Sequence, residues 1–181
     1  MNIDSAILGV LSWKPLSGYD LKKIFRQSSI MYWSGNNNQI YKSLTQLRKD
    51  GFVTTEVQHQ ESTPSRKIYS ITEKGLDELR NAVLDIPDEP EWRKTFLIQL
   101  AWADMTTDEE LAELLSKYEE KVRNALLMEK EKKRRGGCIP ERSLREKFLW
   151  EKIYENIFST LQNELDWIDK MRTELKNNAD L

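Results

Sequence analysis

The sequence contains very little cysteine or histidine, with one of each among 181 residues. Cys138 therefore cannot form an intrachain disulfide, and Cys138 and His59 are too few for a structural zinc site, which takes about four such ligands. Neither a Gly-rich phosphate loop nor a Gly-x-Ser-x-Gly motif is present, and a lone histidine leaves no base for a nucleophile. The sequence thus predicts no metal, no cofactor and no enzymatic activity.

Long apolar runs are also missing. No stretch approaches the roughly 20 residues of a membrane-spanning helix, and residues 1–4 lack the positive charge that begins a signal peptide. Hydrophobic residues make up 39% of the chain and charged residues 32%, which is typical of a folded domain with a heavily charged surface. We therefore expect a cytoplasmic protein.

The charge that is present is divided unevenly along the chain. Residues 1–75 carry ten Lys and Arg against six Asp and Glu, a charge of +4, and the remainder carries 18 against 24, a charge of −6. A basic front half and an acidic back half are typical of a nucleic-acid-binding head on a body that does not touch phosphate.

Two helices are expected before residue 30. Segment 4–13 is rich in apolar residues and ends before Pro15, because proline disfavours the helical conformation in the residue before it. Ser17 and Asp20 then have the spacing of a capping box, in which each side chain binds the backbone amide of the other. We expect this box to open a second helix that runs to about Arg26.

A third helix is expected over residues 37–49. Ile40, Leu44 and Leu47 fall at i, i+4 and i+7, which places them on one stripe of the helix. Asp50 and Gly51 follow this segment, and Gly51 supplies the left-handed backbone that ends many helices. The stripe predicts a helix that buries one face and exposes the other.

The periodicity changes to two after this helix. Val53, Thr55 and Val57 alternate with polar residues, and a second strand-forming run follows at 66–71, so the two predict a hairpin. Thr72 is then placed to cap a fourth helix. Its expected buried stripe consists of Leu76, Leu79 and Val83. Three helices, a hairpin and a further helix make a winged helix-turn-helix.

Residues 87–90, Pro-Asp-Glu-Pro, form the clearest boundary, because two prolines so close together cannot continue a helix. We therefore expect a DNA-binding domain over 1–86 and a helical domain over 91–181. The fold class expected is mainly α with a small β-hairpin wing.

The second half shows helix signals only. The first expected helix is striped by Trp92, Phe96, Leu100 and Ala103. A capping box over residues 107–110 opens a second helix. A third runs from about 140 to 177, a length of about 55 Å. This helix is longer than its own half of the chain can cover, so it predicts a partner, most simply a second copy of the chain in a homodimer.

The N-terminal motifs resemble those of the PadR family of bacterial regulators. Segments 6–11 and 17–21 are similar to its opening helices, 40–53 to its recognition helix and the start of the wing, and 66–75 to its second wing strand and the next helix. The remaining residues resemble the long form of the family in length and helix content. The resemblance implies a repressor whose C-terminal helices dimerise and which a small aromatic, phenolic or drug-like effector releases from DNA.

The outer face of segment 37–49 is the candidate DNA-reading surface. Asparagine and glutamine pair with adenine, lysine suits guanine or phosphate, and the resemblance implies a phosphate contact for the tyrosine hydroxyl. The candidates on this segment are Asn38, Gln39, Tyr41, Lys42, Ser43 and Gln46. Arg66 and Lys67 are the candidates on the wing, where cations neutralise phosphates or enter the minor groove.

Three interpretations stay open. Trp92, Trp102 and Trp150 could line a pocket for a flat aromatic effector, but tryptophans at helical spacing are more often core or interface residues. The basic run 130–135 could touch DNA flanks, although cations at a helix end also complement its dipole. A winged helix that binds protein and not DNA is the alternative function, and retention on duplex DNA at low salt separates the two.

Overall fold

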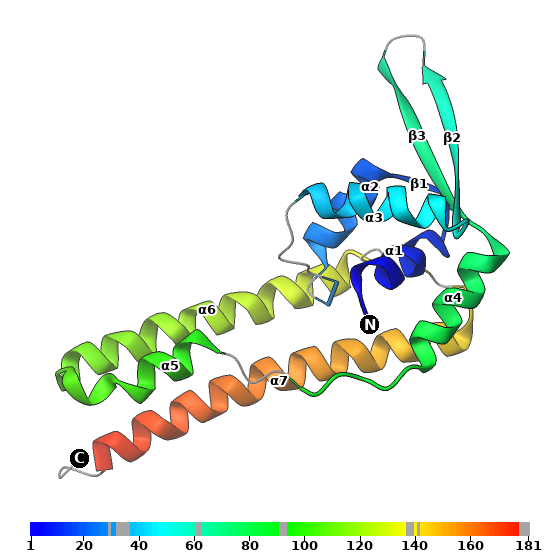
Figure 1. Ribbon diagram of the computed structural model, residues 1–181. Helices are drawn as coiled ribbons and strands as arrows, with labels where there is room; N and C mark the ends of the chain where they lie inside the picture. Colours follow the sequence, from blue (N-terminus) through cyan, green and yellow to red (C-terminus); the bar gives the residue numbers. More distant parts are fainter. Residues whose placement is uncertain are drawn as a thin grey trace. The chain divides into compact units, whose positions relative to one another are not determined.

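The computed structural model describes residues 1–28, 30–31, 37–60, 63–90, 94–136, 140 and 142–177 (Figure 1). The chain divides into two compact units, Met1–Pro90 and Glu91–Leu181. Among the helices within these described ranges, none combines the length and the apolar character needed to cross a membrane.

The N-terminal unit is a winged helix-turn-helix, as expected. Its elements are α1 (Ile3–Leu11), β1 (Leu16–Ser17), α2 (Gly18–Gln27), α3 (Asn37–Lys49), β2 (Val53–Gln60), β3 (Thr63–Ile71) and α4 (Glu73–Leu84). Strands β2 and β3 form a long antiparallel hairpin that projects from the helices (Figure 1). The short strand β1 was not predicted; it pairs with β3 and makes a sheet of order β1-β3-β2.

Local side-chain caps fix the ends of these helices. The capping box at α2 is confirmed, since the Asp20 amide donates to Ser17 Oγ at 3.1 Å and the Ser17 amide donates to Asp20 Oδ2 at 3.3 Å. Thr72 caps α4 through the Gly75 amide at 3.1 Å. Gly51, with φ of 77°, follows α3 in the left-handed conformation that was predicted for it.

One apolar cluster forms the core of the N-terminal unit. The predicted stripe of α3 is confirmed, because Ile40, Leu44 and Leu47 are all buried. They pack with apolar residues of α1, α2 and the sheet, of which Ile7 and Leu21 are fully buried. This core anchors α3 by one face.

The predicted stripe of α4 is wrong in two of its three residues. Leu76 and Val83 are 46% and 65% exposed, and of the three only Leu79 packs against the core. The inner face begins one residue earlier, at the buried Gly75, and continues through Leu79. A Cβ at Gly75 would overlap the carbonyl oxygen of Phe52, so α4 lies too close to the β2 entry for a larger residue at this position.

The C-terminal unit contains only helices in its described part. These are α5 (Thr95–Ala101), the short 3₁₀ helix η1 (Ala103–Met105), α6 (Asp108–Arg134) and α7 (Leu144–Asn177). α5 is shorter than predicted, because the helical hydrogen bonding stops at Ala101 and Ala103 belongs to η1. The capping box that opens α6 is confirmed, since the Thr107 amide donates to Glu110 Oε2 at 2.9 Å and the Glu110 amide donates to Thr107 Oγ1 at 3.2 Å.

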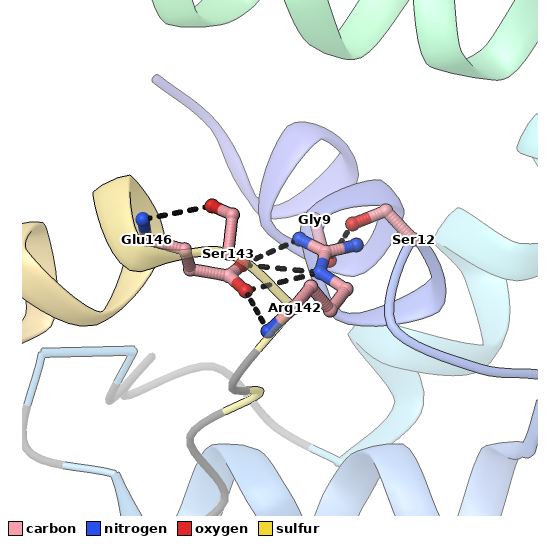
Figure 2. A network of polar contacts seen from close by, with 5 residues as sticks. All are labelled: Gly9, Ser12, Arg142, Ser143 and Glu146. Atoms are coloured by element: carbon pink, nitrogen blue, oxygen red, sulfur yellow. Dashed lines mark hydrogen bonds and ion pairs between the residues drawn. The ribbon is translucent and has the colours of Figure 1, made fainter.

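The two long helices pack against each other. Val122 and Leu126 of α6 and Leu165 and Ile168 of α7 form a buried cluster. α7 begins at Leu144 and not at 140, and Ser143 precedes it as a cap: the Glu146 amide donates to Ser143 Oγ at 3.0 Å (Figure 2). Apolar residues of its first turns are exposed, with Leu144 at 89% and Phe148 at 54%.

Serine and arginine side chains also make polar contacts at the helix ends drawn in Figure 2. In α1, Ser12 Oγ donates to the Gly9 carbonyl at 2.7 Å. At the start of α7, Arg142 Nη2 contacts Glu146 Oε1 at 2.6 Å, and this guanidinium lowers the pKa of the Glu146 carboxyl. Ser12 thus satisfies one of the backbone carbonyls that the end of a helix leaves unpaired.

Candidate nucleic-acid interface

The face of α3 opposite its buried stripe is polar and largely exposed. Asn38 and Lys42 are exposed, Gln39 is half-buried, and Tyr41 is 47% exposed. All four belong to the first half of the helix, the part of a recognition helix that enters a major groove most deeply. The structure therefore gathers four of the six α3 candidates on one accessible surface, which we call the α3 outer face (Asn38, Gln39, Tyr41 and Lys42).

Ser43 does not belong to this surface. It was expected on the outer face but is only 7% exposed. The reason is helical geometry: Ser43 follows Ile40 by three residues and precedes Leu47 by four, so it falls inside the buried stripe. We correct the assignment accordingly, because a side chain on the core face of α3 cannot reach a base edge.

Gln46 is exposed, but its amide group is held within the helix. Gln46 Nε2 donates to both carboxylate oxygens of Asp50, at 2.9 and 3.0 Å. Lys74 Nζ in turn donates to the Asp50 carbonyl at 2.8 Å. The Gln46 amide is thus less available to bind a base than the residues of the α3 outer face.

The base of the wing is tied to the end of α3. Thr72 Oγ1 donates to the carbonyls of Gly51 and Phe52, at 2.8 and 3.1 Å, and the Thr72 amide donates to Phe52 at 3.0 Å. The Lys74 ammonium lies 4.9 Å from the centroid of the Phe52 ring. These bonds fix the direction in which the hairpin leaves the helical core.

The two candidate cations of the wing are both exposed and lie on β3. Arg66 pairs in register with Gln58, and Lys67 with Val57. Because neighbouring residues of a strand point to opposite faces, the wing presents one cation on each face. The hairpin tip, residues 61–62, lies outside the described residues.

Cations of the run 130–135 have partners within the C-terminal unit. Lys132 pairs with the buried Glu129 at 2.5 Å, and Arg134 and Arg135 both pair with Glu131, at 2.6 and 2.7 Å. The two guanidiniums lower the pKa of Glu131 to about 2. These contacts favour a structural role at the end of α6 over a DNA contact.

Lys133, in the same run, lies over two aromatic rings of α7. Its ammonium is 5.7 Å from the centroid of Tyr154 and 5.5 Å from that of Phe158. Such a cation–π contact holds the last turn of α6 against α7.

The structure describes two of the three candidate effector tryptophans, which differ in exposure. Trp102 is 63% exposed, Trp150 is half-buried, and Trp92 lies outside the described residues. In the same unit, Phe96 stacks on Tyr118 with centroids 3.6 Å apart and meets Trp167 edge to face at 6.1 Å.

A polar network adjoins these rings. The Tyr118 hydroxyl donates to Glu164 at 2.7 Å, and Lys94 pairs with the other oxygen of that carboxylate at 2.5 Å. Burial and the nearby Glu164 carboxylate raise the pKa of Tyr118. This network was not predicted from the sequence, because its members are separated by up to 70 residues and share no local motif.

Comparison with known proteins identifies both units. Residues 7–81 match the family described as "Transcriptional regulator PadR-like family", and residues 92–176 match the domain described as "Virulence activator alpha C-term". The chain belongs to the PadR-like family. It has the long form of that family, which confirms the resemblance seen in the sequence, and the family is one of transcriptional regulators and not of enzymes.

One curated relative is the negative transcriptional regulator PadR of Bacillus subtilis. It is 31% identical over 110 residues, which are 60% of this chain and 60% of the relative. The match therefore spans about three fifths of the length of that protein.

Two solved structures of Bacillus subtilis PadR share the fold. The complex with operator DNA has a TM-score of 0.79 at 23% identity and covers 93% of this chain and 95% of PadR. The complex with p-coumaric acid has a TM-score of 0.75 at 22% identity, and the match covers 96% of this chain and 98% of PadR. At this identity the likeness establishes the fold, a winged helix-turn-helix followed by long C-terminal helices.

Proposed function

We propose that this PadR-like chain is a cytoplasmic, sequence-specific DNA-binding repressor that acts as a homodimer. Residues 1–86 would bind DNA, with the α3 outer face in the major groove and Arg66 and Lys67 of the wing on phosphates. The observation that carries the proposal is the polar, exposed face of a helix whose other face is anchored in a winged helix-turn-helix core. The solved complex of Bacillus subtilis PadR with operator DNA supports it.

The homodimer is supported by apolar residues that the C-terminal unit leaves uncovered. On α6 these are Leu127 and Met128, 59% and 62% exposed, and on α7 they include Phe148 and Leu149, 54% and 50% exposed. A second copy of the same unit is the simplest surface to cover them. Two recognition helices would then enter successive major grooves of a pseudo-palindromic site, about 34–36 Å apart.

An effector would act through residues 91–181. We propose a small aromatic compound, since a complex of Bacillus subtilis PadR with p-coumaric acid has been solved. Binding would change the spacing of the two heads and thereby the affinity for DNA, with reciprocal coupling between the two ligands. Of the tryptophans considered for this site, Trp102 and Trp150 stay candidates on the described surface, together with Trp92 from the sequence alone.

Selection of bound duplexes from a random pool by the full chain tests DNA binding. We expect Lys42→Ala to weaken binding to the selected duplex about tenfold, and Gln39→Ala to change the preferred base at one position. Lys117→Ala on α6, the same change on the C-terminal unit, serves as the control and should leave affinity unchanged. Small aromatic compounds can then be screened for release of the wild-type complex.

Two results would contradict the proposal in different ways. Unchanged affinity in both α3 variants would mean that another face reads the DNA. No retention on any duplex, even at low salt, would favour the alternative in which this winged helix binds protein.

A further inference from the structure

The first residue of α2 lies directly against a side chain of α3. A Cβ placed on Gly18 would come within 2.6 Å of Tyr41 Cε1 and within 3.3 Å of Cδ1 and Cζ of the same ring. The three nearest atoms all belong to Tyr41, so the closest contact at this position is with one aromatic ring. Gly18 itself is buried beneath it.

The backbone does not require a glycine here. Within the described part of the chain, Gly51 and Gly136 are the glycines with positive φ, and Gly18 is not among them. Gly18 is the first residue of α2, after the capping serine. Glycine is a poorer helix former than alanine, so the space it leaves for Tyr41 explains its presence better than helix formation does.

Tyr41 lies on the α3 outer face, next to Lys42. Its side chain is 47% exposed, and Thr45 Oγ1 donates to its carbonyl at 2.8 Å. Contact with Gly18 on one side restricts the orientations of the ring and therefore of its hydroxyl. A side chain that is already oriented loses less conformational entropy when it binds a ligand.

We propose that Gly18 is a positioning residue for DNA binding. By leaving room for the Tyr41 ring, it holds the Tyr41 hydroxyl where that group donates a hydrogen bond to a backbone phosphate of the duplex. This inference rests on the proposed function, and it extends the site from the α3 outer face to the start of α2.

The contact with a side chain distinguishes Gly18 from a glycine that the fold needs. At Gly75 an added Cβ would meet a backbone oxygen, whereas at Gly18 it would meet the end of an exposed ring that can turn away. Gly18→Ala is therefore expected to move Tyr41 and to leave the backbone in place. Its effect should appear in DNA affinity and not in stability.

A double-mutant cycle on the full chain tests this. Wild type, Gly18→Ala, Tyr41→Phe and the double variant are titrated against a duplex selected from a random pool and against a random-sequence duplex of equal length, at several salt concentrations. We expect each single variant to weaken binding about tenfold, the loss of one hydrogen bond to a charged group. The double variant should equal Tyr41→Phe, because without the hydroxyl its position no longer matters.

The phosphate contact has two further signatures. Both duplexes should lose affinity by the same factor, since phosphates carry no sequence information. The slope of log affinity against log salt should stay that of the wild type, because tyrosine releases no counterion. A loss confined to the selected duplex would mean that Tyr41 reads a base, and the inference would be wrong.

Other outcomes also overturn it. Unchanged affinity in Gly18→Ala, or additive effects in the double variant, would show that Gly18 does not act through the hydroxyl. If Gly18→Ala lowers the melting temperature and a further Tyr41→Ala does not restore it, Gly18 is needed for the stability of the fold and not for the position of Tyr41. Failure of the wild type to bind either duplex contradicts the proposed function itself and is recognised before any variant is compared.

Discussion

In the N-terminal unit, thirteen described apolar residues form one buried cluster, whereas the α6–α7 cluster of the C-terminal unit has four. The short helices and the sheet of the first unit enclose a common centre. Two long helices that pack side by side bury only the stripe between them. The N-terminal unit therefore has the larger core of its own, and the C-terminal unit exposes Leu127, Met128 and Phe148, the residues on which the proposed homodimer rests.

The largest effect is expected at the base of the wing in the N-terminal unit. Gly75→Ala would force a methyl group into the carbonyl oxygen of Phe52, which also accepts the amide of Thr72. Backbone atoms cannot turn aside, so we expect a loss of about 3 kcal/mol in the free energy of unfolding, as for overpacked cores. Urea unfolding followed by circular dichroism measures it.

Gly9→Ala is the matched control for this variant. A Cβ at Gly9 would contact only Leu79 Cδ1, at an ordinary 3.9 Å. Alanine favours the helical state of α1, so we expect a gain of up to about 1 kcal/mol. Equal stability of the two variants would show that the close approach of α4 to the β2 entry is not as described.

A smaller effect is expected on association through the C-terminal unit. Leu127→Asp combined with Met128→Asp places two charges on the uncovered surface of α6. If a second copy covers this surface, we expect association to weaken by about 2 kcal/mol, roughly 30-fold. Light scattering over a range of protein concentrations measures the change.

The control places two charges at exposed positions of the same helix that lie ten or more residues away, Ala112→Asp and Lys117→Asp. It should leave the oligomeric state unchanged. A wild-type protein that is monomeric at roughly micromolar concentration would remove the contrast between the two units. Equal weakening of association by the two double variants would do the same.

The smallest effect is expected from acid. Carboxyls whose pKa is lowered by nearby hydrogen bonds or cations occur in the C-terminal unit, namely Glu109, Glu113, Glu119, Glu131 and Glu146. A pKa that is lower in the folded state stabilises the protein above the unfolded value of about 4.3, and this contribution is lost as the pH falls through the folded value. For Glu131 that window extends from about 4.3 to about 2.

We therefore expect Glu131→Gln to reduce the difference between melting temperatures measured at about pH 5 and about pH 2.5. The Glu131 side chain is 38% exposed and its partners are surface arginines, so the change should be small. Glu151→Gln, at an exposed position of α7, is the control. A larger acid response in Glu131→Gln than in the wild type would contradict the assignment of these pairs.

Local interactions were the predictable part of this fold. The capping boxes at Ser17 and Thr107 and the left-handed Gly51 depend on residues a few positions apart, and all three were read correctly from the sequence. The outward position of Lys42 followed from the buried stripe on the other side of α3. The same stripe also implies the buried position of Ser43, three residues after Ile40 and four before Leu47, but its polar side chain led to its assignment to the outer face.

The sequence alone determined which segments are helices, where hydrophobic periodicity, caps and glycine agree within a few residues. It also determined that one face of α3 would be anchored and the other polar. Only the tertiary structure decided the pairing of β1 with β3, the inner face of α4 and the contact between Gly18 and Tyr41. In each of these, the residues that meet are far apart in the chain, and their contact depends on how closely two elements approach, a distance that no local pattern encodes.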